Sequence, residues 1–92
     1  MLFRSAVDKY GVVAIIGPGT SSIAEAVYNE VKDEVLIISP SATSDSLTFI
    51  DGTNKGFENP GLFWRTAPPD SGIAQRMASE LIASGRTKVA LI

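Results

Sequence analysis

The sequence contains no cysteine and no histidine. Without cysteine the chain forms no disulfide, no thiol nucleophile and no thiolate metal site. Without histidine it lacks the usual general base of serine and cysteine hydrolases and the commonest metal ligand. The carboxylates also form no pair placed to share one site, since Asp33 and Glu34 are typical of a solvated corner before a strand. We therefore expect no enzyme activity, no catalytic residues, no metal site and no cofactor.

Long apolar runs and clustered positive charge are missing as well. No apolar run approaches the roughly 18–20 residues that cross a bilayer, so we expect no membrane insertion. Eight Lys and Arg against ten Asp and Glu give a net charge of −2, and the positive charges are scattered. This distribution argues against a nucleic-acid partner. Residues 1–4 show no basic stretch followed by an apolar one, so no signal peptide is recognised.

The composition is that of a folded protein of small size. The chain has 92 residues, of which 45% are hydrophobic and 20% are charged. This length fits one small domain or a piece of a larger one.

Hydrophobic periodicity predicts helices that alternate with strands. Apolar residues recur at helical spacing over 2–10, 22–31 and 71–84, and Gly11 and Gly85 are placed to end the first and the third helix. Ser22 and Glu25 have the spacing of a capping box at the start of the second helix. Short apolar runs predict strands at 12–16, 35–38, 62–65 and 88–92. Because unbroken β-branched runs are typical of strands buried on both faces, we expect an α/β fold with a three-layer, mostly parallel sheet and flanking helices.

The segment 39–61 interrupts this alternation with prolines, glycines and many hydroxyl side chains. Connections of this length are uncommon unless they bind a ligand or move. A short helical turn is expected around 45–49.

Two hydroxyl-rich segments are the candidate binding loops. Residues 17–22 read Gly-Pro-Gly-Thr-Ser-Ser between a strand and a helix, and residues 39–44 read Ser-Pro-Ser-Ala-Thr-Ser after the next strand. The first is neither a P-loop nor a dinucleotide fingerprint. In an open parallel sheet both loops lie at the edge where ligands bind. Neutral donors at a helix N-terminus suit a carboxylate or a small zwitterion; the alternative is a helix cap and a solvated turn.

Five blocks in order carry a resemblance to a known family. They are Val-Ala-Ile-Ile-Gly-Pro at 13–18, Thr-Ser-Ser at 20–22, Ile-Ile-Ser-Pro-Ser-Ala-Thr at 37–43, Phe-Trp-Arg-Thr-Ala-Pro at 63–68 and Lys-Val-Ala-Leu-Ile at 88–92. In this order and spacing the chain resembles type I periplasmic binding proteins. It is most similar to the branched-chain amino-acid-binding proteins of ABC transporters.

The resemblance implies a binding role for specific residues. In that family two lobes clamp an amino acid, and its head group is held by positions that correspond here to Ser21, Ser41, Ala42 and Thr43, with Ser22 a weaker candidate. The implied partners are an amino acid or amide ligand and an ABC permease, and the implied location is periplasmic or extracellular. Residues 1–66 correspond to a partial first lobe. Residues 67–92 correspond to the first helix and strand of the second, packed with 1–66 as one compact unit or swapped.

The chain also departs from the family pattern, because the family's first strand and helix and most of its second lobe have no counterpart. We therefore expect a fragment with weak affinity, near or above the millimolar range. The unpaired edge of strand 12–16 predicts a homodimer or higher oligomer in which segment 88–92 fills the gap, within one chain or between two. Two further readings stay open: a structural or oligomerising α/β domain without a ligand, and, less favoured, an anion-binding enzyme subdomain that uses Ser21 and Ser22.

Overall fold

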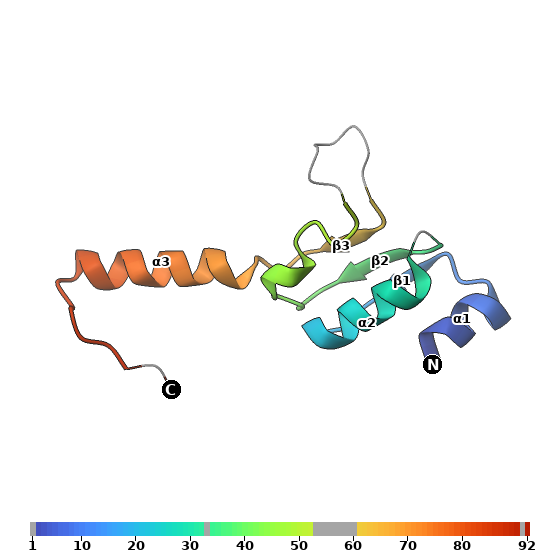
Figure 1. The fold of residues 1–92 in the computed structure, drawn as a ribbon, viewed down its shortest axis with the longest axis horizontal. Coiled ribbons are helices and arrows are strands. Elements are labelled where there is room, and N and C mark those ends of the chain that lie inside the picture. The colour runs from blue at the N-terminus through green and yellow to red at the C-terminus, as the bar shows by residue number, and fades with distance from the viewer. Residues whose placement is uncertain (1, 33, 53–60, 91) are drawn as a thin grey trace.

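The structure is a computed structural model that describes residues 2–32, 34–52, 61–90 and 92. Figure 1 shows helices and strands alternating along the first two thirds of the chain. The elements in order are α1 (Leu2–Tyr10), β1 (Ala14–Ile16), α2 (Ser21–Val31), β2 (Leu36–Ser39), the 3₁₀ helix η1 (Asp45–Leu47), β3 (Phe63–Arg65) and α3 (Asp70–Ala83). The alternation predicted from hydrophobic periodicity is confirmed for these elements, and so is the short turn after residue 44.

The three strands form one parallel sheet in the order β1-β2-β3. Ile15 pairs with Ile37, and Ile37 pairs in turn with Phe63. The α/β class with a parallel sheet and flanking helices is thus confirmed. The strand predicted at 88–92 is wrong for the described residues 88–90 and 92, which have no regular structure; Leu91 lies outside the described residues. A β-branched run alone forms no strand here, because no neighbouring strand of the described chain supplies it with hydrogen bonds.

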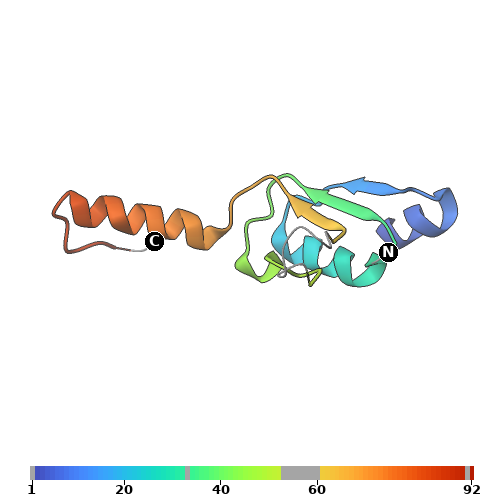
Figure 2. The same ribbon diagram turned by 90° about the horizontal axis from the view of Figure 1, so that it is seen from above.

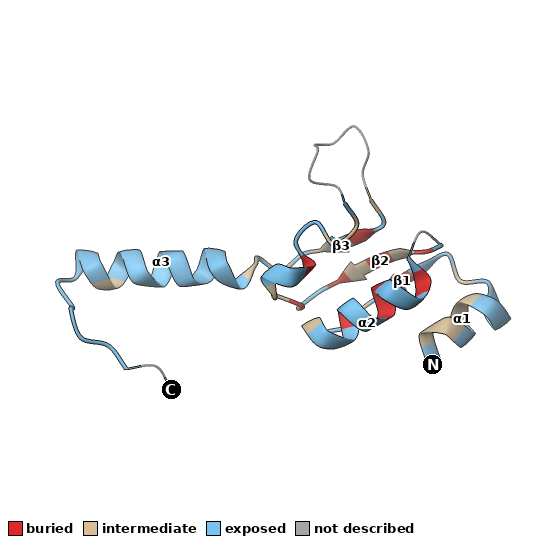
Figure 3. Ribbon diagram, viewed as in Figure 1, coloured by how far each residue is buried: buried red, intermediate tan, exposed pale blue. Residues whose placement is uncertain are grey.

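One face of the sheet carries the hydrophobic core. Ile15, Ile37 and Phe63 are buried on this face, and the inner side of α2 packs against them through Ala24, Val27, Tyr28 and Val31. The rings of Tyr28 and Phe63 meet edge to face, with centroids 6.1 Å apart. Figure 2 shows α1 and α2 on the same side of the sheet, and Figure 3 shows the buried residues concentrated between α2 and the strands. Cover on both faces was expected, but the described helices cover only this one.

Glycine residues end two of the helices, α1 and α3. Gly11 and Gly85 both have positive φ, 62° and 75°, as expected for residues that end a helix. The capping box predicted from Ser22 and Glu25 is wrong. Helix α2 begins one residue earlier, with Thr20 as N-cap, and no side chain caps it.

Helix α3 extends away from the sheet (Figures 1 and 2). None of its residues is buried, and the molecule measures 56 × 32 × 16 Å along its principal axes. The predicted division of the chain after residue 66 stays a prediction.

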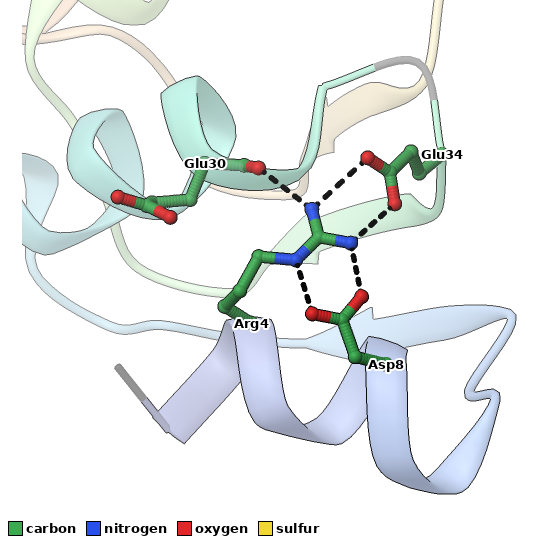
Figure 4. A network of polar contacts seen from close by, with 4 residues as sticks. All are labelled: Arg4, Asp8, Glu30 and Glu34. Atoms are coloured by element: carbon green, nitrogen blue, oxygen red, sulfur yellow. Dashed lines mark hydrogen bonds and ion pairs between the residues drawn. The ribbon is translucent and has the colours of Figure 1, made fainter.

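Arg4 joins α1 to the end of α2 (Figure 4). Its guanidinium donates to both carboxylate oxygens of Asp8, to both of Glu34, at 2.9 and 2.7 Å, and to the Glu30 carbonyl at 2.9 Å. These hydrogen bonds lower the pKa of Asp8 and of Glu34 below their usual range, and they raise the pKa of Arg4. The network holds α1 beside α2, where Phe3 and Val7 pack against the core.

We expect the free energy of unfolding to depend less on pH when Arg4 is replaced by Met. A carboxyl group whose pKa is lowered by folding stabilises the folded state above its unfolded pKa of about 4, and this contribution is lost as the pH falls through the folded pKa. Wild-type stability in urea unfolding should therefore drop between about pH 5 and pH 2, and the Arg4→Met curve should drop less. Arg76→Met is the matched control, since the Arg76–Glu80 ion pair lies within α3 and links no second element. If stability fell equally steeply with pH in wild type and in Arg4→Met, the hydrogen bonds of Arg4 would not be the cause of the lowered carboxyl pKa values.

Candidate functional site

The parallel register brings the ends of β1 and β2 to one edge of the sheet. Ile16 pairs with Ile38, so the chain leaves both strands at the same level. The N–H of Gly17 continues the pairing one step further and donates to the Ile38 carbonyl at 2.8 Å. Gly17 has a φ of 115°, a conformation that favours glycine, and there the chain turns toward α2. The two hydroxyl-rich loops thus meet at this edge, as the sequence predicted.

Two hydrogen bonds tie the loops directly together. The Ser44 N–H donates to Ser21 Oγ at 3.0 Å, and Ser41 Oγ donates to the Gly19 carbonyl at 2.9 Å. The approach at Gly19 is close, because a Cβ added there would lie 3.1 Å from Ser41 Oγ. A larger residue at this position would therefore require the Ser41 side chain to move by a few tenths of an ångström.

The N-terminus of α2 points into this arrangement with free hydrogen-bond donors. The first intrahelical bond runs from the Ala24 N–H to the Thr20 carbonyl at 2.9 Å, and Thr20 makes no side-chain cap bond. The backbone N–H groups that precede Ala24 in the helix therefore have no intrahelical acceptor. Such groups, with the positive end of the helix dipole, favour an anion.

The candidate side chains differ in the hydrogen-bond donors and acceptors that they can still offer to a ligand. Ser21 is half-buried and accepts one hydrogen bond, so its own hydroxyl proton can still be donated. Ser41 is exposed and uses its proton on Gly19, which leaves its lone pairs as acceptors. Within the described chain, the hydroxyls of half-buried Thr43 and exposed Ser22 have no protein partner.

Ala42 is placed differently from the other four candidates. Its side chain is fully buried in the core, and its N–H donates to Ser39 Oγ at 3.2 Å. The side chain and the N–H of Ala42 thus both make contacts inside the protein. A direct ligand contact by Ala42 stays a prediction that rests on the resemblance alone.

Two residues that hold the site together were not among the predicted site residues, although Ser39 belongs to the predicted second loop. Ser39 is 0% exposed, donates to the Pro18 carbonyl at 2.6 Å and accepts from Ala42, so one hydroxyl links both loops. Arg65, on β3, donates to the Ser44 carbonyl at 2.6 Å and to Thr48 Oγ1. Both lie inside blocks that carry the resemblance, but only a fold that brings β3 beside β2 shows what they contact.

The chemistry of the site is that of neutral donors and acceptors. Among residues 17–22 and 39–44, no side chain is charged. In the part of the chain that the structure describes, no group of three or more metal-ligating side chains comes together. Nor does any helix of those residues combine the length and apolarity that a bilayer span requires. The arrangement can hold a small polar group by hydrogen bonds.

No protein-family model matches the chain, and comparisons with curated proteins and with solved structures likewise find no match. The assignment to a family of binding proteins therefore stays a prediction from the five sequence blocks.

Replacement of Ser39 by Ala is expected to destabilise the protein by about 1–3 kcal/mol, because it leaves a part-buried carbonyl and a buried N–H without their partner. Chemical denaturation measures this change in the free energy of unfolding. Ser5→Ala is the control, since Ser5 is exposed on α1, and it should stay within about 0.5 kcal/mol of wild type. Equal stabilities of the two variants would show that Ser39 does not hold the loops.

Proposed function

We propose that the chain is a solute-binding module whose two-loop site holds the head group of an amino acid. The observation that carries the proposal is the hydrogen-bonded junction of the loops at the uncapped N-terminus of α2. An α-carboxylate fits the free N–H groups of the helix and the Ser21 hydroxyl, both of which are donors. An α-ammonium fits the acceptor oxygens of Ser41 and Thr43.

Weak binding follows from the openness of the site. The described residues supply donors and acceptors from one side of the ligand only, and no side chain of residues 17–22 and 39–44 carries a charge to offset its desolvation. We expect dissociation constants near or above about 1 mM, which corresponds to about −4 kcal/mol. The resemblance extends the proposal to delivery of an amino acid to an ABC permease in the periplasm or outside the cell.

Titration calorimetry at millimolar ligand tests the proposal. Leucine, isoleucine, valine and small amides are the ligands, and isoamylamine, which has no carboxylate, is the control ligand. Thr43→Val is the sharpest variant, since it removes a hydroxyl that makes no bond within the described chain and leaves the loop contacts in place. It should weaken binding about 3- to 10-fold, the effect of one hydrogen bond.

Ser79→Ala is the matched control variant, because Ser79 lies on exposed α3 and bonds only within that helix, to Gln75. It should bind like wild type. Absence of heat with every amino acid, or equal binding of isoamylamine, would contradict the proposal.

A second function is favoured by a separate observation. Apolar side chains remain exposed on the sheet and along α3, as expected of a structural or oligomerising α/β domain with no ligand. The strand edge of β1, unpaired within the described chain, fits the same reading. This role does not depend on the hydroxyl cluster, so the ligand titration distinguishes it from solute binding.

A further inference from the structure

The second face of the sheet is apolar and uncovered. Strand alternation places five residues opposite the core face: Ala14, Ile16, Leu36, Ile38 and Trp64, here called the open face. The register aligns Ile16, Ile38 and Trp64 in one row across the three strands. Ile16 is 76% exposed and Trp64 is 46% exposed. A parallel sheet is ordinarily covered on both faces, and no helix among the described residues covers this row.

Helix α3 carries an apolar surface that also lacks a partner. Helical spacing places six residues on one side, here called the α3 stripe: Ile73, Ala74, Met77, Ala78, Leu81 and Ile82. Met77 is 60% exposed and no residue of the helix is buried. Arg76 lies on the other side of the helix, and its ion-pair partner Glu80, at 2.6 Å, borders the stripe beside Met77. The chain thus holds two unpartnered apolar surfaces, one a sheet face and one a helix stripe.

The start of α3 is fixed in a direction that leads away from its own sheet. The Ser71 N–H and Oγ both donate to the carboxylate of Asp45, at 3.1 and 2.6 Å, and the Asp70 N–H donates to the Thr43 carbonyl at 2.8 Å. Asp45 thereby caps α3 in place of its N-cap residue Pro69, which has no side-chain cap bond. Only residues 66–69, two of them proline, connect β3 to the helix. Folding α3 back onto its own open face would break these three bonds.

We propose that the open face is covered by the α3 stripe of a second copy, in a reciprocal dimer. In this arrangement each chain gives one helix and receives one. Such a two-fold exchange is isologous and closes, so it yields dimers rather than fibres.

The dimensions of the two surfaces agree with this pairing. A helix of 14 residues is about 21 Å long, and the outer strands of a three-stranded sheet lie about 10 Å apart, so one helix spans the row of three strands. A stable interface of standard size buries about 800 Å² on each partner. In a reciprocal exchange each copy contributes two surfaces, its stripe and its open face, so each surface needs to bury about 400 Å² to reach this size. Because the net charge of each chain is only −2, electrostatic repulsion between two copies is small.

The chain's single tryptophan reports directly on the proposed contact, since Trp64 lies on the open face. Sedimentation of the 92-residue chain at roughly 100 μM, above the dissociation constants typical of standard interfaces, should give twice the monomer mass. The emission of Trp64 should move to shorter wavelength as concentration rises. Met77→Glu should return the mass to that of a monomer and abolish the emission change. Ser79→Glu, on the side of the same helix away from the stripe, should change neither.

A cross-linking experiment distinguishes the exchange of α3 between two copies from other kinds of dimer and from packing of α3 on the open face of its own chain. The chain has no cysteine, so Met77→Cys and Ile38→Cys each introduce a single thiol. A mixture of the two variants under mild oxidation should form a mixed disulfide of twice the chain mass. The double variant at low concentration should give little monomer with an internal bond. A monomeric wild type, a dimer that survives Met77→Glu, or ready internal closure of the double variant would each overturn the proposal.

Discussion

The parallel pairing of β1 with β2 is the constraint on which the rest of the structure depends. It places Ile15 and Ile37 side by side under α2, and it brings the chain out of both strands at one edge. Parallel strands require a crossover, and α2 supplies it. The N-terminus of that same helix then stands at the edge where the second loop emerges. The positions of the core, of the N-terminus of α2 and of the hydroxyl-rich loops therefore all follow from the pairing of β1 with β2.

Much of this arrangement follows from local sequence. The apolar runs before Gly17 and before Pro40 predict buried strands, and two loops after parallel strands must share an edge. Contacts between distant segments do not follow from such patterns. The bond from Ser39 to Pro18 and the role of Arg65 depend on which strands become neighbours, and no local signal encodes that choice. The apolar run at the end of the sequence shows the converse, because it satisfies the strand pattern, yet its described residues 88–90 and 92 form no strand.

The second loop connects the candidate site to α3. Thr43 contributes its hydroxyl to the site and its carbonyl to the first turn of α3, and the next residues lead into η1, whose Asp45 caps that helix. Arg65 holds the same loop from β3 through the Ser44 carbonyl. A shift of this loop would therefore alter both the acceptors offered to a ligand and the direction of α3. The proposed ligand site and the proposed dimer contact therefore depend on the same short stretch of backbone.

In the proposed site, the uncapped start of α2 and the loop after β2 together hold one amino-acid head group. Amide chemical-shift mapping by NMR during a leucine titration tests it most directly. Binding at this site should progressively shift the Ser22 and Ile23 amides at the helix start and the Thr43 amide in the facing loop, with α1 and the end of α3 unaffected. Shifts spread evenly over the surface, or confined to one of the two loops, would contradict it.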